Sequence, residues 1–308
     1  IILKNLDKDR EKEILKLVDF MEKYMDGEKL DVDFDGVRQK VSDKDSALNK
    51  YINKALDEID PNVLKTIVLN LGFEAFLNGT KTIRKMREKY NCNVPWLILM
   101  DPTSACNLHC TGCWAAEYGN KLNLTFDEMD RVVTQGKELG IYLYMFTGGE
   151  PLVRKSDIIK LCEKHNDCAF LSFTNGTLVD EAFCEDMKRV GNLYLAISLE
   201  GFEAVNDLRR GDGVYGKVMH AMDLLKKYGL VFGTSICYTS KNTETVTSDE
   251  FIQLMVDKGC RYAMYFHYMP VGNDASVELL PTPEQRIYMK DRIRQIRSLT
   301  TGQGLFTF

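Results

Sequence analysis

Residues 96–114 read WLILMDPTSACNLHCTGCW and join a short apolar run to a loop that contains three cysteines. The apolar run, residues 96–100, has the length and composition of a buried strand. After the loop, residues 125–128 read TFDE, a capping box that predicts the start of a helix. We therefore expect a strand, a cysteine-rich loop and a helix in succession, which is the repeating unit of a parallel α/β sheet.

Five further apolar runs follow this first unit along the chain. They are Tyr142 to Thr147, Phe170 to Thr174, Leu193 to Ser198, Val231 to Tyr238 and Tyr262 to His267. Amphipathic stretches separate them, and a second capping box at residues 282–285, with Pro283 at the first helical position, follows the last run. Six βα units predict an α/β fold with an open, partial (β/α)6 barrel over residues 94–300, because a closed barrel needs eight.

The two ends of the chain carry different signals. Apolar residues recur at helical spacing over residues 14–25, and Asp60 followed by Pro61 marks the start of another helix. We expect a helical N-terminal segment at residues 1–93. Residues 301–308 end in LFTF, which has the composition of a strand start, so we expect them to begin a C-terminal region of a longer protein.

The overall composition narrows the class of protein. A net charge of −5 gives no reason to expect a nucleic-acid partner. No apolar run approaches the roughly 20 residues that cross a bilayer, and the first ten residues lack the basic start and apolar core of a signal peptide. We therefore expect a cytoplasmic protein whose nine cysteines are reduced thiols, some of them available to a metal.

The candidate metal ligands are Cys106, Cys110 and Cys113. Their spacing allows three thiolates of one loop to converge on a small cluster, and three ligands would leave one iron open for a substrate or cofactor. Two alternatives from other classes remain, an iron-sulfur electron-transfer protein with a fourth ligand and a zinc-binding protein completed by His109 or a distant cysteine. The other six cysteines lack ligand spacing and are expected to be small buried side chains.

A C-x3-C-x2-C loop after the first of six βα units resembles the radical S-adenosylmethionine (radical SAM) superfamily. The resemblance implies a [4Fe-4S] cluster on Cys106, Cys110 and Cys113, with S-adenosylmethionine on the open iron. It also implies a flavodoxin or ferredoxin as electron donor, and reductive cleavage to a 5′-deoxyadenosyl radical that takes hydrogen from the substrate under anaerobic conditions. One feature departs from the pattern, because members commonly have an aromatic residue directly before the third cysteine and this chain has Gly112.

Gly148, Gly149 and Glu150 follow the second predicted strand. Two glycines let the backbone approach a ligand closely, and a carboxylate accepts hydrogen bonds from an ammonium group. These residues resemble the superfamily's Gly-Gly-Glu motif, which implies that they hold the amino group of S-adenosylmethionine. An ordinary turn is the alternative.

Four more residues are candidates for cofactor binding. The resemblance implies that Ser198 and Glu200, after the fourth predicted strand, contact the ribose or methionine part of the cofactor, and that Arg210 reaches the methionine carboxylate. Helix capping and an exposed basic turn are the alternatives. Asn175 follows the third predicted strand and faces the same end of the sheet as the cysteine loop, although an Asn-Gly turn is the interpretation we prefer.

The N-terminal segment bears on the substrate. Residues 63–77 are apolar around most of the helix circumference and precede a basic run at residues 81–89, a pattern that suits a peripheral membrane contact. Packing against the barrel or a second subunit explains the same pattern and is the interpretation we prefer. The layout nevertheless resembles radical enzymes that act on lipids. The substrate is thus open between a lipid, a peptide modified by a maturase and a small molecule.

Overall fold

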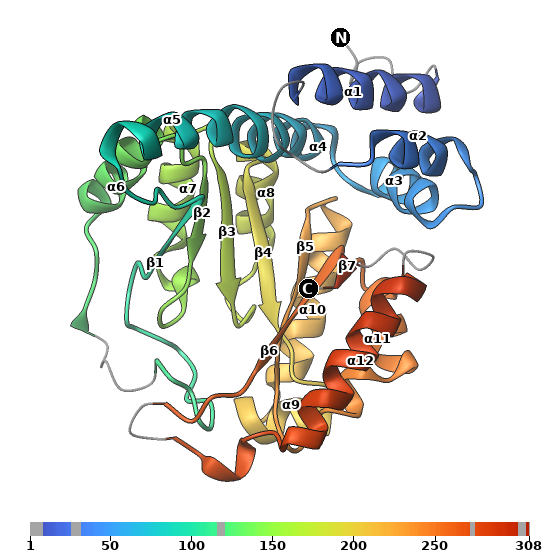
Figure 1. Cartoon of the computed structure of the whole chain (residues 1–308). Coiled ribbons are helices and arrows are strands. Elements are labelled where there is room, and N and C mark those ends of the chain that lie inside the picture. Colours follow the sequence, from blue (N-terminus) through green and yellow to red (C-terminus); the bar gives the residue numbers. More distant parts are fainter. Residues whose placement is uncertain (1–8, 26–31, 116–120, 272–274, 301–305, 308) are drawn as a thin grey trace.

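The computed structural model describes residues 9–25, 32–115, 121–271, 275–300 and 306–307, without the side chains of residues 298–300 and 306. Its centre is a curled parallel sheet whose strands follow one another in chain order (Figure 1). The strands are β1 (Leu97–Met100), β2 (Leu143–Phe146), β3 (Ala169–Thr174), β4 (Leu193–Ser198), β5 (Phe232–Tyr238), β6 (Tyr262–His267) and the short β7 (Phe306–Thr307). The partial (β/α)6 fold is confirmed.

Helices connect the strands and cover the outer face of the sheet (Figure 1). They are α6 (Phe126–Glu138), α7 (Lys155–Lys164), α8 (Glu181–Val190), α9 (Glu203–Arg210), α10 (Val214–Lys227), α11 (Asp249–Asp257) and α12 (Pro283–Thr300). Both predicted capping boxes are present, since Thr125 and Glu128 bond reciprocally, as do Thr282 and Gln285. Because β1 to β6 are parallel, their carboxyl ends and the loops that follow them lie at one edge of the sheet.

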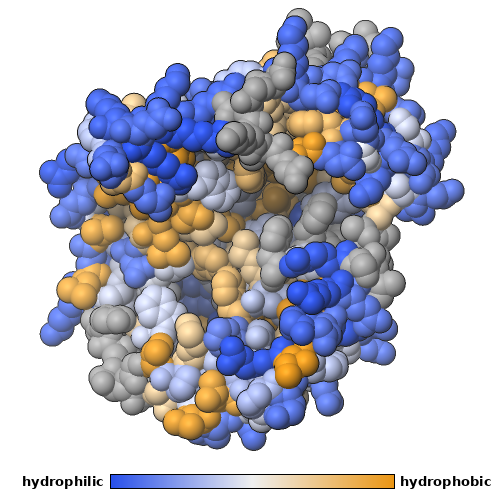
Figure 2. Space-filling model, in the orientation of Figure 1, coloured by the Kyte–Doolittle hydropathy of each residue, from blue (hydrophilic) through white to orange (hydrophobic). Residues whose placement is uncertain are grey.

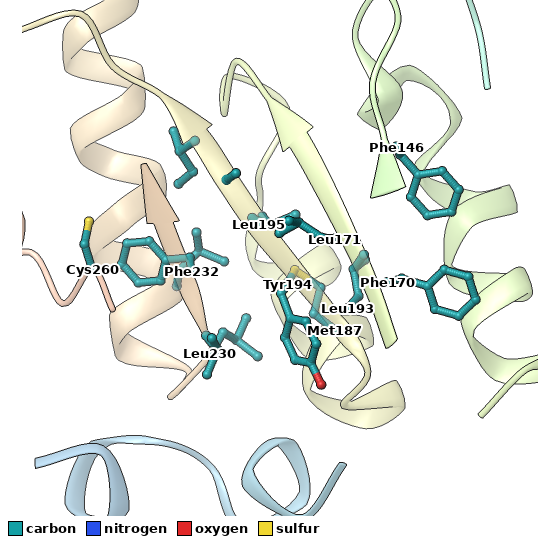
Figure 3. Close-up of a cluster of buried hydrophobic side chains, with 14 of the residues drawn as sticks. Phe146, Phe170, Leu171, Met187, Leu193, Tyr194, Leu195, Leu230, Phe232 and Cys260 are labelled. Atoms are coloured by element: carbon teal, nitrogen blue, oxygen red, sulfur yellow. The ribbon is translucent and has the colours of Figure 1, made fainter. Parts of the chain in front are cut away.

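The outer face of the sheet carries the core. The Tyr144 hydroxyl donates to the carbonyl oxygen of Val133 in α6 at 3.0 Å, so this side chain points to the helices. The Phe146 and Phe170 rings are parallel, with centroids 5.7 Å apart, and both are fully buried (Figure 3). Near-complete burial of such rings contributes roughly 1.5–3 kcal/mol each, which makes this layer the main source of stability for the barrel.

The concave face of the sheet is apolar but open. Side chains alternate along a strand, so Leu99 and Met145, which are paired in register, face away from the helices. The Phe173 ring of β3 meets the Phe266 ring of β6 edge to face, with centroids 6.0 Å apart. Leu99 and Phe266 are about half exposed, at 52% and 47%. In the space-filling view, apolar side chains gather over the middle of this side of the molecule (Figure 2).

The N-terminal segment is helical, as expected. It consists of α1 (Arg10–Met25), α2 (Phe34–Ser42), α3 (Ala47–Glu58), α4 (Pro61–Thr66), a π-helix (Ile67–Gly79) and α5 (Thr80–Tyr90). The helices from α4 to α5 lie across the end of the sheet where the strands begin (Figure 1). This position accounts for the apolar run 63–77, because its Ala75 carbonyl accepts from the Trp96 indole and Phe76 packs on the Trp96 ring at 4.9 Å.

The basic run after the π-helix is partly used inside the protein. The Lys81 ammonium donates to the Tyr24 carbonyl oxygen and lies over the Tyr24 ring, and the Arg87 guanidinium donates to the Val94 carbonyl oxygen. Among the described residues, no helix has both the length and the apolar character needed to cross a bilayer. The boundaries at 93/94 and 300/301 stay predictions, and most of residues 301–308 lie outside the described residues.

Candidate functional site

The three candidate ligands lie on the loop after β1, at the carboxyl edge of the sheet. Cys106, Cys110 and Cys113 are all partly exposed. Burial raises the pKa of Cys106, and the charges of Glu150, Cys110 and Cys113 add to the rise. Within the described residues, however, no three His, Cys, Asp or Glu side chains are arranged as a ready metal site.

Positive charge borders this cysteine loop. Burial raises the pKa of Cys110, whereas the guanidinium groups of Arg210 and Arg209 act in the opposite direction and favour the thiolate. Iron-sulfur clusters bind thiolates and carry net negative charge, so three thiols beside two arginines fit such a cluster chemically. The donor set is therefore chemically compatible with the predicted ligands.

The Gly-Gly-Glu residues pack directly against the cysteine loop. The Gly149 amide donates to the Thr103 carbonyl oxygen at 2.9 Å, and the Glu150 amide donates to the Ala105 carbonyl oxygen at 2.7 Å. A Cβ on Gly149 would lie 2.2 Å from the same Ala105 oxygen, and one on Gly148, where φ is +109°, would lie 2.6 Å from the Thr103 oxygen. Both glycines are thus required by the close approach of two loops, a reason that the sequence did not show.

The Glu150 carboxylate faces the interior. It is 1% exposed and accepts hydrogen bonds from the Leu152 amide (2.9 Å), the Thr174 hydroxyl (2.6 Å) and the Asn175 amide (2.7 Å). Burial raises the pKa of Glu150, while these donors oppose the rise. Glu150 therefore ties the loop after β2 to the end of β3. Its role toward an ammonium group stays a prediction.

The Asn175 side chain closes a turn and also hydrogen-bonds to the cysteine loop. Its side-chain oxygen accepts from the backbone amide and the hydroxyl of Thr177, at 2.9 and 2.7 Å, which is the turn expected of an Asn-Gly pair. Its side-chain nitrogen donates to the Asn107 side-chain oxygen at 2.8 Å. Asn107, which the sequence analysis did not single out, donates in turn to the Thr177 hydroxyl. The end of β3 therefore holds the cysteine loop in place.

Glu200, which follows β4, forms ion pairs with the two arginines at the end of α9. Its carboxylate is fully buried, and one oxygen accepts from Arg209 Nη1 at 2.7 Å and from Arg210 Nε at 3.0 Å. The other oxygen has no hydrogen-bond partner among the described residues. Ser198, two residues earlier, is partly buried and pairs in register with Ser235 of β5. Of the predicted residues, Glu200 and Arg210 are thus in direct contact, and Arg209 joins them.

Sequence reasoning missed Cys237 at the end of β5. It was expected to be an ordinary buried thiol, but the register pairs it with Phe266 of the concave face. Burial raises the pKa of Cys237 to about 11, with Glu200 and Cys113 adding to the rise and Arg209 opposing it. This thiol therefore belongs to the same neighbourhood as the cysteine loop. Alternation along the predicted strand was the signal that could have placed it there.

A pocket of about 470 Å³ lies between the cysteine loop and the Gly-Gly turn. Asp101, Trp114, Gly148 and Gly149 are among the residues that line it. The Asp101 carboxylate accepts from the Thr147 hydroxyl at 2.5 Å. A volume of this size is in the range of small-molecule sites, and a carboxylate and backbone groups supply polar contacts. Of the predicted cofactor residues, Gly148 and Gly149 line this pocket, whereas the three cysteines do not.

Comparison with known proteins decides the family. The family model of the radical SAM superfamily matches residues 100–255, which include the cysteine loop, the Gly-Gly-Glu turn and the arginine pair. The chain belongs to the radical SAM superfamily. This confirms the resemblance found in the sequence, and the radical SAM chain is accordingly an enzyme of that class, whose members use a [4Fe-4S] cluster and S-adenosylmethionine.

The radical SAM relatives act on different molecules. Over 202 residues the chain is 28% identical to the AdoMet-dependent heme synthase of Methanosarcina barkeri, covering 63% of this chain and 57% of that protein. Over 217 residues it is 28% identical to the PqqA peptide cyclase of Granulibacter bethesdensis, covering 68% and 57%. The chain thus spans little more than half the length of these curated relatives.

Solved radical SAM structures share the fold. The crystal structure of Streptococcus suis SuiB bound to its precursor peptide SuiA has a TM-score of 0.62 and 16% identity, covering 75% of this chain and 53% of that one. The anaerobic sulfatase-maturating enzyme anSMEcpe, with bound AdoMet and a peptide, has a TM-score of 0.57 and 21% identity, covering 68% and 63%. At these identities the likeness shows the fold alone.

Proposed function

We propose that this chain reductively cleaves S-adenosylmethionine at a [4Fe-4S] cluster bound by Cys106, Cys110 and Cys113. The observation that carries the proposal is the loop after β1, which bears three cysteines and is hydrogen-bonded to the arginine pair of α9, within the residues matched by the superfamily. When bound, the cluster would supply the electron that breaks a carbon–sulfur bond of S-adenosylmethionine and yields the 5′-deoxyadenosyl radical.

The protein's own contribution is binding and orientation. Arg209 and Arg210 place positive charge next to Cys110, which favours the thiolate form of that side chain. The same charge would complement the methionine carboxylate of S-adenosylmethionine. Gly148 and Gly149 keep side chains out of the space between the two loops. Glu150 and Asn175 fix those loops to β3, so that the ligands keep their relative positions.

For the substrate, we favour a peptide. Support comes from two relatives that modify peptides or proteins by name, the PqqA peptide cyclase and the cysteine-type anaerobic sulfatase-maturating enzyme of Clostridium perfringens, which is 27% identical over 168 residues. A tetrapyrrole is the second candidate, because the heme synthase relative and the Fe-coproporphyrin III synthase of Methanosarcina barkeri match over a similar length. The names of these four relatives give no support to a lipid substrate.

Hydrogen transfer distinguishes these substrate classes. The reduced chain is incubated anaerobically with S-adenosylmethionine and either a deuterated peptide fraction of cell extract or deuterated iron coproporphyrin III. Mass spectrometry then measures deuterium in 5′-deoxyadenosine. Deuterium from the peptide fraction alone supports a maturase, deuterium from the porphyrin alone overturns it in favour of tetrapyrrole chemistry, and deuterium from neither overturns both assignments.

The remaining partners stay proposals. A flavodoxin or ferredoxin is the expected donor of the electron, in a cytoplasmic and anaerobic setting. A peripheral membrane contact is also proposed, because exposed basic residues such as Lys85 are available to bind anionic headgroups. The variant Lys85→Glu should then weaken co-sedimentation with anionic liposomes at low salt, and a chain that does not co-sediment at all contradicts the contact.

A further inference from the structure

Gly112, the residue before the third cysteine, has a neighbour that explains why it carries no side chain. Its φ is +67°, in the region that favours glycine. A Cβ at this position would lie 2.5 Å from the hydroxyl oxygen of Tyr268 and 2.9 Å from the ring carbon Cε2. Real Cβ atoms essentially never come so close, so the Tyr268 ring fills the space that a side chain at 112 would enter.

Tyr268 reaches this place from β6, four strands away from β2 and five from β1 in the sheet order. It directly follows β6, and its amide donates to the Tyr238 carbonyl oxygen at 2.9 Å. Figure 1 shows the segment after β6 running to the same end of the molecule as the loop after β1. The Tyr268 side chain is 2% exposed, and its hydroxyl accepts from the Ser276 amide at 2.9 Å. The ring is therefore fixed by contacts on both its edge and its hydroxyl.

The cysteine turn is also held by α9. The Thr111 amide donates to the Arg209 carbonyl oxygen at 2.9 Å, and the Arg209 guanidinium carbon lies 6.0 Å from the centroid of the Tyr268 ring. Arg209 itself is anchored by its ion pair with Glu200. The turn from Cys110 to Cys113 consequently contacts both Tyr268 and the end of α9.

We infer that Tyr268 is a positioning residue for the cluster, supplying from the segment after β6 the aromatic packing that the chain lacks at position 112. The inference rests on the proposed function, because it concerns the environment of the bound cluster. Without the ring, the backbone at Gly112 would be restricted only by the hydrogen bonds of Thr111 and Cys113. The turn that carries Cys110 and Cys113 would then be less fixed in geometry, and its partly exposed cysteines would be more exposed to water. Both changes alter cluster retention and potential.

The test compares Tyr268→Ala, Tyr268→Phe and Tyr265→Ala after anaerobic reconstitution. Tyr265 is the matched control, since it lies on β6 but sends its hydroxyl to the Val246 carbonyl oxygen, away from the cysteine loop. Tyr268→Ala should lose iron to a chelator roughly 10- to 100-fold faster than the wild type and shift its reduced electron paramagnetic resonance spectrum. Tyr268→Phe keeps the ring and should restore both properties, whereas Tyr265→Ala should leave the spectrum unchanged.

A double-mutant cycle addresses the contact itself. Gly112→Ala should speed iron loss in the wild-type background because its Cβ meets the Tyr268 hydroxyl. In the Tyr268→Ala background the same change should have a smaller effect, since the obstruction is gone and only the strain of the positive φ at position 112 remains. Additive effects would overturn the inference, as would a wild-type spectrum and iron-loss rate in Tyr268→Ala. A wild-type chain that binds no cluster would instead overturn the proposed function.

Discussion

Replacing Glu150 by alanine removes a carboxylate that accepts hydrogen bonds from three buried donors. The Leu152 amide, the Thr174 hydroxyl and the Asn175 amide would all face an empty, buried space. Each buried donor left without an acceptor costs about 1–3 kcal/mol, so the loss of all three acceptors by Glu150→Ala should lower the free energy of unfolding by roughly 3–9 kcal/mol. This loss is comparable to the whole stability of many domains, which is about 5–15 kcal/mol.

Glutamine at the same position is the informative comparison. Glu150→Gln keeps one oxygen for Leu152 and Thr174 but turns an amide N–H toward the Asn175 N–H, so one donor pair is opposed. The expected loss is about 1–3 kcal/mol. A fall in affinity for S-adenosylmethionine in this stable variant would then report on the cofactor rather than on folding, as the Gly-Gly-Glu interpretation predicts.

Urea unfolding of the metal-free variants, followed by circular dichroism, measures these losses. Glu181→Ala is the matched control, because Glu181 is an exposed carboxylate whose partner is the exposed Lys227, and its unfolding midpoint should not change. A wild-type midpoint for Glu150→Ala would refute the assignment of Glu150 as the tie between β2 and β3.

Three further results are expected. Cys106→Ala should abolish iron binding on anaerobic reconstitution. Cys162 is a fully buried thiol on α7, so Cys162→Ala should retain iron. Full iron content in Cys106→Ala would exclude the ligand assignment. Glu200→Ala should lower the free energy of unfolding by about 3–5 kcal/mol, because two partly buried guanidinium groups lose their carboxylate, and an unchanged urea midpoint would contradict this. Gly148→Ala should lower the melting temperature because of its φ of +109° and the Thr103 oxygen, and an unchanged melting curve would speak against the close approach of the loops.

The strands were predictable because their signal is local. Buried parallel strands are nearly continuous apolar runs, so β4 and β6 have the predicted bounds and the other four differ by one residue at one or both ends. Helix starts with reciprocal caps, as at Thr125, were equally visible. The apolar run at residues 63–77 was also noticed, but its π-helical part and its contact with Trp96 depend on packing against the barrel.

The arrangement of the site could be predicted only in part. The cysteine spacing indicated the candidate ligands, since all three are on one loop; their binding of a cluster stays a prediction. The inward direction of the Glu150 carboxylate, the tether from Asn175 to Asn107, and the contact of Tyr268 with Gly112 join residues that are far apart in the sequence. No local pattern encodes such contacts, because they arise only when the ends of several strands meet at one edge of the sheet.

Reductive cleavage of S-adenosylmethionine tests the central claim most directly. The chain is reconstituted with iron and sulfide, reduced with dithionite and incubated with S-adenosylmethionine, with Cys110→Ala as the control. The account predicts a brown protein that forms one 5′-deoxyadenosine for each S-adenosylmethionine consumed, only when reductant is present, and no product from Cys110→Ala. A brown protein that is reduced and reoxidised without consuming S-adenosylmethionine, or a colourless protein that contains zinc, would contradict it.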